Sequence, residues 1–369
     1  MENTSTTASA VAPFFAQTYS EARKKFLAAA SRGGLDVQSA MHPQRGQDGE
    51  ALAVDVARFG RADAQALLVI SSGCHGAEGF CGSGVQNALL ADADFHTAAT
   101  QADVAVLYLH ALNPHGFSWW RRTTNENVDL NRNWQDFSQP LPENPGYEEL
   151  ADAIVPDVWP PTPENEAVLA DYAQRHGAMG LQAAISGGQY THHDGLFFGG
   201  TSVSWCRQAL TASLAAHGRQ CKRLGWIDLH TGLGPSGVGE RIFAAPFDAA
   251  TLARARAWWG DEVTCLEEGN SSSAPVTGTI WNAAAQACPQ AEYTGIALEY
   301  GTLPIEQVLY ALRADQWREN HPATPAALAA QIRRQTRNAF YIDTPQWQEQ
   351  IVTQGLQVAR QAVAGLAAK

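Results

Sequence analysis

The stretch LLVISSGCHGAE, residues 67–78, decides the fold and the site that this sequence predicts. Leu67–Ile70 is an apolar run typical of a buried strand, and Ser71–Cys74 supplies the turn that leaves it. His75 and Glu78 follow, three residues apart. An imidazole and a carboxylate at this spacing can bind zinc if a third ligand comes from elsewhere, with one coordination position left for water. Alone the pair is a weak motif, because most such pairs are an exposed acid near an ordinary histidine.

Further apolar segments predict strands, with helical patterns between several of them. These segments are Ala51–Phe59, Val104–Leu109, Leu224–Leu229, Arg241–Ala245 and Gly295–Tyr300. Short apolar strands that alternate with helices favour an α/β fold with a mixed, largely parallel central sheet and helices on both faces. Ligands of such folds bind beyond the carboxyl ends of the strands, and His75 follows one such end.

No linker or internal repeat divides the chain, so its 369 residues predict a single domain, 1–369. We expect an N-terminal helical brace at about 14–32 and a helical C-terminal extension at about 305–369. The segment Ser138–Pro163 is rich in proline and carries few regular signals, so it predicts a long surface loop.

Composition excludes several kinds of partner. A net charge of -12 argues against nucleic acid or an anionic membrane surface. No apolar run could cross a bilayer, and Met1–Val11 lacks the basic and apolar segments of a secretory signal, so we expect a soluble protein. The six cysteines are scattered without a Cys-x-x-Cys pair, as is typical of reduced thiols in a cytoplasm. The oligomeric state stays open.

Two more regions carry candidate site residues. WIDLHTG, residues 226–232, is an apolar strand that ends in His230, a candidate third ligand or simply a hydrogen-bonded histidine at a strand end. NPHGF at 113–117, WRR at 120–122 and VDLNRNW at 128–134 place three arginines within twelve residues of an acidic chain. Such a cluster could be a solvated loop with surface salt bridges, but the order of the motifs indicates otherwise.

That order resembles the zinc carboxypeptidase family. Its pattern is His-x-x-Glu, Asn-Pro-x-Gly, an arginine, Val-Asp-x-Asn-Arg-Asn, a strand-end histidine and a catalytic glutamate, and here it runs from His75 to Glu299. The segments GGQYTH at 187–192 and GLFFGG at 195–200 look like a signature of a poorly characterised, mainly bacterial branch of the family. The resemblance implies a zinc carboxypeptidase-like fold.

The resemblance also implies a metal centre. His75, Glu78 and His230 would bind one zinc ion, which lowers the pKa of a water molecule toward about 7. Glu299 would be the catalytic acid-base, which takes the proton of the water and passes it to the leaving amine.

The remaining motif residues are implied to bind substrate or to position ligands. Arg122 would stabilise the charge on the carbonyl oxygen, and Arg121 is the alternative if the register differs by one. Asn131 and Arg132 would bind the free carboxylate of the substrate, since a guanidinium pairs with a carboxylate through two parallel hydrogen bonds. Asp129 would orient His75 through its other ring nitrogen.

One departure from the family leaves the substrate open. The digestive members have a mobile tyrosine before the catalytic glutamate, and Asn270–Ile280 contains none. Tyr190 or Tyr293 could replace it, or closure could be absent. His192 and His193 could bind a second metal, but we expect them on a loop that lines the pocket.

The sequence thus predicts a zinc-dependent hydrolase of an amide bond next to a free carboxylate, most simply a carboxypeptidase for small or unusual peptides. An aspartoacylase-like deacylase of N-acyl amino acids is the alternative, because it shares the His-Gly-x-Glu and Asn-Arg elements. A noncatalytic binding module stabilised by zinc is the alternative from another class, although such modules normally lack the glutamate that stands here at Glu299.

Overall fold

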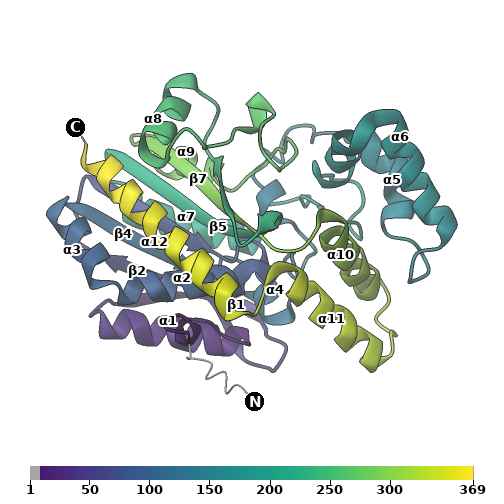
Figure 1. Ribbon diagram of the computed structural model, residues 1–369, viewed down its shortest axis with the longest axis horizontal. Coiled ribbons are helices and arrows are strands. Elements are labelled where there is room, and N and C mark those ends of the chain that lie inside the picture. The colour runs from purple at the N-terminus through teal and green to yellow at the C-terminus, as the bar shows by residue number, and fades with distance from the viewer. Residues whose placement is uncertain (1–8, 369) are drawn as a thin grey trace, which may run out of the picture.

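A mixed seven-stranded sheet forms the centre of the computed structural model, which describes residues 9–368 (Figure 1). Its order is β1-β2-β4-β3-β5-β7-β6. The strands are β1 Val37–Arg45, β2 Ala51–Phe59, β3 Ala66–Ser72, β4 Val104–His110, β5 Arg223–Ser236, β6 Gly239–Phe243 and β7 Glu292–Gly301. Residues 1–8, most of the segment from which we predicted no secretory signal, lie outside the described residues.

The parallel part of the sheet is its middle. Strands β4, β3, β5 and β7 are parallel neighbours, whereas β1, β2 and β6 join at the two edges in antiparallel pairs. The predicted mixed α/β sheet is confirmed, and every predicted strand is present. Strand β1 was missed because it is an edge strand with mostly exposed residues and a proline, Pro43, so it shows no apolar run.

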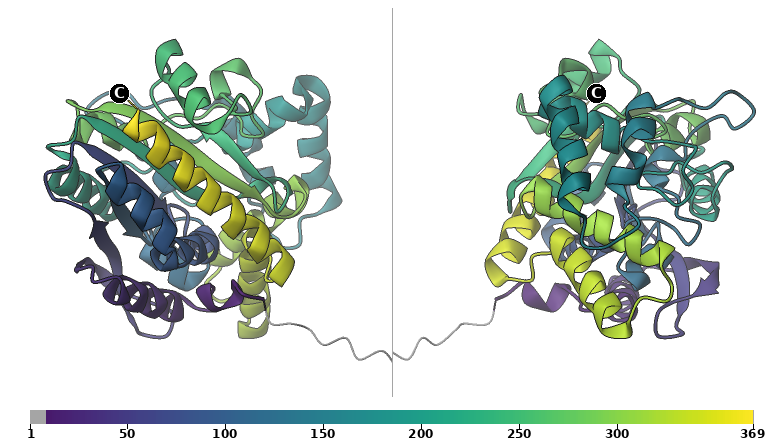
Figure 2. Two further views of the ribbon diagram at one scale, coloured as in Figure 1. Left: turned by 60° about the vertical axis from the view of Figure 1, so that its left-hand side comes forward. Right: turned by 90° about the vertical axis from the view of Figure 1, so that its right-hand side faces the viewer.

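Helices cover both faces of this sheet, as predicted. The α-helices are α1 Tyr19–Arg32, α2 Gly79–Ala91, α3 Ala93–Gln101, α4 Pro114–Trp119, α5 Pro145–Ile154, α6 Pro163–Ser186, α7 Trp205–Gly218, α8 Ala249–Trp259, α9 Asn282–Ala287, α10 Ile305–Asn320, α11 Ala326–Phe340 and α12 Pro345–Ala367. In Figure 2 the long helix α12 lies across one face of the sheet. Alternate residues of β3 divide between two apolar clusters: Leu68 and Ile70 pack with α2 and α12, and Leu67 and Val69 pack with α7.

The predicted surface loop at Ser138–Pro163 is wrong over ten residues, because α5 occupies Pro145–Ile154. Its proline stands at the first helical turn, where the missing N–H is no loss, and the Asn144 side chain caps the helix by accepting from the Tyr147 amide. Helices α5 and α6 pack together and form a lobe beside α10 (Figure 1). This lobe becomes one wall of the cavity described below.

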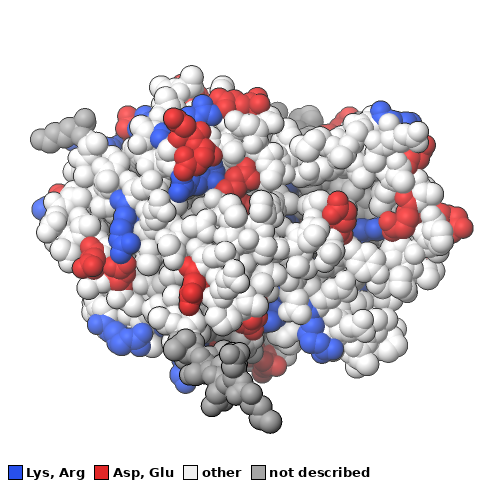
Figure 3. Space-filling view, in the orientation of Figure 1, with Lys and Arg blue, Asp and Glu red and all other residues white. Residues whose placement is uncertain are grey.

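The two ends of the described chain are helical. Helix α1 falls within the predicted brace at 14–32 and packs on α2, and α10, α11 and α12 fill most of 305–368. The single-domain organisation, the cytoplasmic location and the choice of partners stay predictions. None of the helices within residues 9–368 combines the length and apolarity needed to span a bilayer. On the face drawn in Figure 3, basic and acidic side chains are interspersed.

Candidate active site

Three neighbouring parallel strands, β3, β5 and β7, bring the predicted metal ligands and Glu299 together. His75 follows β3 and precedes a short 3-10 turn, Gly76–Glu78, that carries Glu78. His230 lies on β5 directly opposite Glu299 on β7. Strand β5 continues to Ser236, so His230 stands where β3 ends rather than where its own strand ends. The parallel register therefore places these side chains at one edge.

The turn after β3 requires glycine at position 76. A side chain there would collide with the backbone of Gly116, since a Cβ atom would lie 2.0 Å from its carbonyl carbon. The Gly76 amide instead donates to the Arg122 carbonyl at 3.1 Å. The His-x-x-Glu turn thus packs against Gly116 of the Asn-Pro-x-Gly turn and is hydrogen-bonded to Arg122.

His75, Glu78 and His230 form a compact donor set. Their ligand atoms all lie within 4.8 Å of one another, and all three residues are buried. The Nδ1 atoms of both imidazoles face the carboxylate: His75 Nδ1 lies 2.8 Å from Glu78 Oε1, and His230 Nδ1 lies 2.9 Å from Glu78 Oε2. Two imidazole nitrogens and one carboxylate are a donor set of catalytic zinc sites. The structure therefore brings together the predicted ligands.

The other ring nitrogens face carboxylates. His75 Nε2 lies 3.1 Å from Asp129 Oδ1, the residue predicted to orient it, and His230 Nε2 lies 2.5 Å from Asp228 Oδ2. Because an ionised carboxylate only accepts, Asp228 keeps the His230 proton on Nε2 and turns Nδ1 toward Glu78.

Asp228 was missed in the sequence, although a signal was present. Asp228 and His230 are two residues apart on β5, and a strand places such side chains on the same face. The carboxylate is itself fixed, because its Oδ1 lies 2.5 Å from Ser71 Oγ, which in turn accepts from Trp226 Nε1 at 2.7 Å. A buried hydrogen-bonded chain thus runs from Trp226 to the ligand imidazole.

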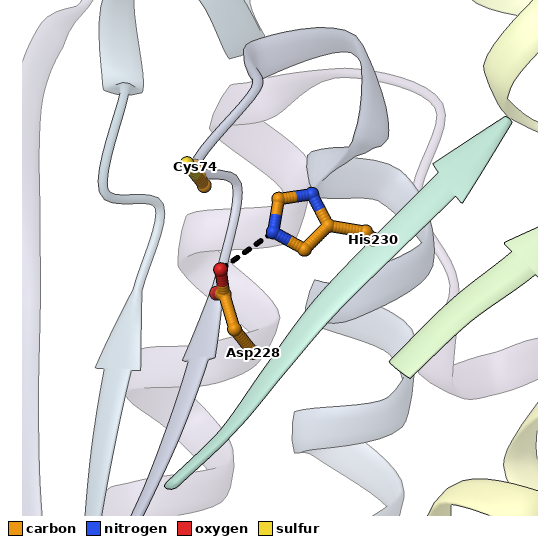
Figure 4. A group of neighbouring side chains, drawn as sticks. All are labelled: Cys74, Asp228 and His230. Atoms are coloured by element: carbon orange, nitrogen blue, oxygen red, sulfur yellow. Dashed lines mark hydrogen bonds and ion pairs between the residues drawn. The ribbon is translucent and has the colours of Figure 1, made fainter. Parts of the chain in front are cut away.

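Figure 4 shows this side of the site, where Cys74 lies near Asp228 and His230. These three residues also form a compact group of donor atoms. His230 turns its Nε2 toward this group and its Nδ1 toward Glu78, so the two groups share one imidazole but not one nitrogen. Burial raises the pKa of the Cys74 thiol well above its usual range, which keeps the sulfur protonated. The donor set of His75, Glu78 and His230 is therefore the better fit to a metal ion.

The charges around the donor set favour a cation. Burial by itself would lower the pKa of His230, but the carboxylate of Asp228 and the hydrogen bonds to Asp228 and Glu78 hold that pKa well above its usual range. Burial would likewise raise the pKa of Glu78, yet His75 and His230 hold it below its usual range. A site that stabilises a proton on an imidazole and an ionised carboxylate beside it provides the field that a metal cation needs.

The two neighbouring arginines have different positions. Arg122 lies at the donor set: its Nε donates to Asp129 at 2.9 Å and its Nη1 donates to Glu78 at 3.3 Å. Arg121 does not reach the cavity, because its buried guanidinium donates to Asp315 at 3.0 Å and to Asn127 at 3.1 Å. The structure therefore places Arg122, and not Arg121, beside the donor set in the cavity.

Asn131 and Arg132 lie in the same cavity as the donor set. The Asn131 side-chain oxygen accepts from the Ile280 amide at 2.9 Å. Arg132 is 4% exposed, and its terminal nitrogens donate to the carbonyls of Asn131 and Ser186 at 2.8 and 2.6 Å. Its Nε has no hydrogen-bond partner, and no carboxylate from residues 9–368 pairs with it within 4.0 Å.

Glu299 is half-buried and lines the same cavity, next to His230 on the neighbouring strand. One carboxylate oxygen accepts from the Leu233 amide at 3.0 Å. Burial and the nearby charge of Glu78 raise the pKa of Glu299 to about 7. A carboxyl with that pKa can accept and release a proton near neutral pH, as a general acid-base requires.

These side chains line one cavity of about 310 Å³. The metal-donor and acid-base residues occupy one part, and apolar residues from α6, α10, α11, β6 and the segment 266–281 enclose the rest. Ser273 and Val276 belong to the segment in which the family tyrosine is missing, so that segment still lines the cavity.

Other predicted candidates lie outside the cavity lining. His192 bonds to Glu148, and His193 does not line the cavity. The Tyr190 hydroxyl donates to the Arg132 carbonyl at 2.8 Å, and the Tyr293 hydroxyl donates to the Ala244 carbonyl at 2.7 Å. Both hydroxyls are thus held by backbone oxygens rather than directed at the metal donors.

Sequence comparison relates most of the chain to one family. Residues 15–354 match a family model described as "Protein of unknown function (DUF2817)". No curated protein matches the sequence.

Several solved structures are similar. Bovine thrombin-activatable fibrinolysis inhibitor, in complex with tick carboxypeptidase inhibitor, has a TM-score of 0.45 and 11% identity, over 92% of this chain and 97% of that chain. A metallo-carboxypeptidase from Burkholderia cenocepacia has a TM-score of 0.41 and 12% identity, over 94% and 68% of the two chains. An ectoine utilization protein from Ruegeria pomeroyi has a TM-score of 0.33 and 15% identity, over 82% and 66%.

Proposed function

The chain belongs to the DUF2817 family, and we propose that it is a zinc-dependent hydrolase that cuts an amide bond next to a free carboxylate. The leading form is a carboxypeptidase that acts on small or unusual peptides. A deacylase of N-acyl amino acids uses the same chemistry on a different acyl group, so it is the alternative outcome of the test below.

One observation carries the proposal: a buried arginine without an acidic partner shares a cavity with a complete metal-donor set. Buried charges in proteins are normally paired, because an unpaired ion loses its hydration without compensation. Arg132 lacks such a pair among residues 9–368 and leaves its Nε unbonded. The carboxylate of a substrate would complete the pair.

His75, Glu78 and His230 would hold the zinc ion. When bound, zinc polarises a carbonyl group and lowers the pKa of a water molecule, which prepares both partners of an amide hydrolysis. Asp129 and Asp228 keep the two imidazoles oriented toward Glu78.

Glu299 carries the protons. With a pKa near 7 its carboxylate takes a proton from the attacking water molecule and then gives it to the nitrogen of the leaving amine. Arg122 stabilises the negative charge that develops on the carbonyl oxygen, because its guanidinium is fixed beside Glu78 and Asp129. Arg132 and Asn131 hold the substrate carboxylate, so the amide bond lies at a set position.

Hydrolysis of matched substrates tests the proposal. The zinc-loaded protein is assayed on blocked dipeptides, on N-acyl amino acids and on the same compounds with the carboxylate converted to an amide. We expect turnover of free acids only, loss of turnover in Glu299→Gln by about 100-fold or more, and unchanged zinc content in that variant.

Each other outcome contradicts a part of the proposal. Equal turnover of acids and amides would contradict the role of Arg132, and retained turnover in Glu299→Gln would contradict its acid-base role. Turnover of N-acyl amino acids alone would make the protein a deacylase. Zinc binding without turnover of any substrate would identify a noncatalytic module.

A further inference from the structure

We infer that the substrate carries an uncharged apolar group on each side of the amide bond, as in a short N-acyl derivative of an apolar amino acid. This inference rests on the proposed function and specifies its substrate. It is carried by two apolar walls of the cavity, one at β6 and β7 and one that reaches Gly232 on β5.

The first wall is formed by neighbouring residues of β6 and β7, next to Glu299. Ile242 on β6 is directly opposite Ala297 on β7, and both are buried in a small apolar cluster that Leu266 and Trp281 complete. Ala297 precedes Glu299 by two residues, so the two side chains share a face of the strand. All of these apolar residues line the cavity.

This wall is joined to the residues that would bind the carboxylate. The amide of Ile280, directly before Trp281, donates to the side-chain oxygen of Asn131 at 2.9 Å. Two residues earlier, Gly278 accepts from the amide of Trp134 at 2.9 Å. The side chain next to a carboxylate held by Asn131 and Arg132 would therefore have this wall within reach.

The second wall comes from α6, α10, α11 and Phe197, which lies between α6 and α7. Its buried members belong to one apolar cluster, and each of them lines the cavity: Ile185, Phe197, Val308, Leu312 and Phe340, with Leu181 and Leu309 packed against them. The Phe340 ring packs against Gly232. A Cβ atom added at Gly232 would lie 3.1 Å from the Phe340 ring. Gly232 precedes Leu233, whose amide holds the Glu299 carboxylate. The second wall thus reaches the site at β5, whereas Ile242 lies on β6, at the other side of β7.

Charge is almost absent from both walls. Apart from the donor set, Arg122, Arg132 and Glu299, the only charged residue that residues 9–368 contribute to the cavity lining is Glu306, which is exposed at the start of α10. A charged substituent on either side of the amide would lose its hydration against apolar side chains without gaining a partner. An apolar substituent gains contact with them, and one methylene group in such a pocket changes kcat/KM by about tenfold or more.

The enclosure also limits the length of the substrate. Helix α6 is tied to the segment opposite it, because Gln182 donates to the Ser272 carbonyl at 3.0 Å. The cavity volume of about 310 Å³ is at the lower end of the range for small-molecule sites, roughly 300–1,000 Å³. A short molecule fits such a space.

Two pairs of substrates test the inference on the zinc-loaded enzyme. N-butanoyl-leucine is compared with N-butanoyl-glutamate for the first wall and with N-succinyl-leucine for the second. We expect kcat/KM at least tenfold higher for N-butanoyl-leucine in both comparisons. A charged compound that is hydrolysed as fast as its apolar counterpart overturns the inference for that side while leaving the proposed function intact.

Binding separates this inference from the proposed function. Calorimetry on zinc-loaded Glu299→Gln measures the affinity for the same three compounds, whether or not the native enzyme hydrolyses them. At least tenfold tighter binding of N-butanoyl-leucine supports the two apolar walls. Equal or tighter binding of the charged compounds overturns them, and absence of turnover by the native enzyme overturns only the hydrolase.

Two variants assign each wall to one side of the substrate. Ile242→Trp should lower kcat/KM for leucine derivatives at least tenfold more than for glycine derivatives. Leu309→Trp should lower kcat/KM for substrates with long acyl chains at least tenfold more than for substrates with short acyl chains. Val238→Trp and Gln307→Trp are the matched controls. Val238 directly precedes β6 and Gln307 is on α10, and both residues are exposed and do not line the cavity. Equal losses on all substrates would contradict the assignment, and thermal unfolding confirms that the variants fold.

Discussion

Arg121 and Arg132 are buried to the same extent, at 3% and 4% exposure, but their surroundings differ. Arg121 lies in a cluster beneath α10, where Asp315, Glu319, Asn127 and Gln316 surround its guanidinium. Arg132 lies in the cavity, where it has backbone carbonyls but no carboxylate from residues 9–368 within 4.0 Å.

This difference separates a structural cation from one that is available to a ligand. Arginine cannot lose its proton in a protein, so burial forces it to find a negative partner. Arg121 has that partner within the chain. For Arg132 we propose that the partner is the substrate.

The largest effect is expected from a substitution that removes the acidic partner of Arg121. Asp315→Asn leaves Arg121 and Arg318 with Glu319 as their only acidic neighbour among the described residues. We expect the free energy of unfolding to fall by about 3–5 kcal/mol, because a buried charge loses its partner. Denaturant unfolding measures the loss, and kcat/KM of the folded variant should stay within about twofold.

A matched change keeps that test interpretable. Glu319 is 43% exposed on its side chain, so Glu319→Gln should cost less than about 1 kcal/mol. If Asp315→Asn were no more damaging than Glu319→Gln, the cluster beneath α10 would not be the structural counterpart of the cavity arginine.

The next effect concerns Arg132 itself. Arg132→Met keeps the apolar stem and removes the charge, so kcat/KM for substrates with a free carboxylate should fall by about 100-fold or more. Stability should change by less than about 1 kcal/mol, because the lost hydrogen bonds are offset by the removal of an unpaired buried charge. Steady-state kinetics and denaturant unfolding test both parts. A large loss of stability with unchanged kcat/KM would reverse the comparison.

A smaller effect is expected for Asp228, a buried acid that bonds to the metal-ligand candidate His230 instead of to an arginine. Asp228→Asn should weaken zinc binding by about 10–100-fold, because His230 loses the carboxylate that fixes its tautomer. Competition with a chelator measures the affinity without any substrate. Asp315→Asn serves as the control and should leave zinc affinity unchanged, so equal weakening in both variants would contradict the role of Asp228.

The smallest expected effect concerns His110, a buried group that is neutral in the folded protein and so needs no charged partner. Burial lowers the pKa of His110 to about 4, and its Nε2 bonds to Ser83 Oγ at 3.0 Å. In the unfolded chain this histidine takes up a proton near pH 6.5, whereas in the folded chain it does so only near pH 4. Its contribution to the free energy of unfolding is therefore complete above pH 6.5 and is lost as the pH falls toward 4. Between pH 7.5 and 5.5 this residue should account for about 1.3 kcal/mol of lost stability.

The pH profile of a variant tests that contribution. In His110→Gln the free energy of unfolding should fall less between pH 7.5 and 5.5 than in the native protein, by about the same 1.3 kcal/mol. Parallel profiles for the two proteins would show that His110 is charged in the folded state.

Local patterns explain why much of the fold was predictable. The run Leu67–Ile70 is apolar on both faces because β3 is covered on both sides, so the strand is visible without any partner. Strand β1 and helix α5 were hidden for local reasons as well. An exposed edge strand has no apolar run, and a proline in the first turn of a helix looks like one in a loop.

The site was predictable only in part. The residue types and their order gave His75, Glu78, His230 and Glu299, all of which the structure brings into one cavity. Asp228 could have been found from its spacing to His230 on the strand. The two apolar walls could not, because α6, α10 and β6 approach the cavity from distant parts of the chain.

The sequence by itself determined all strands but β1, the helical ends and the residue types of the site, because periodicity and motif spacing are local properties. Only the tertiary structure decided which of two adjacent arginines faces the cavity. Arg121 is paired with Asp315, which stands 194 residues away, whereas Arg122 meets Glu78 and Asp129. The role of a buried charge depends on the partner that folding brings to it, and no local pattern contains that partner.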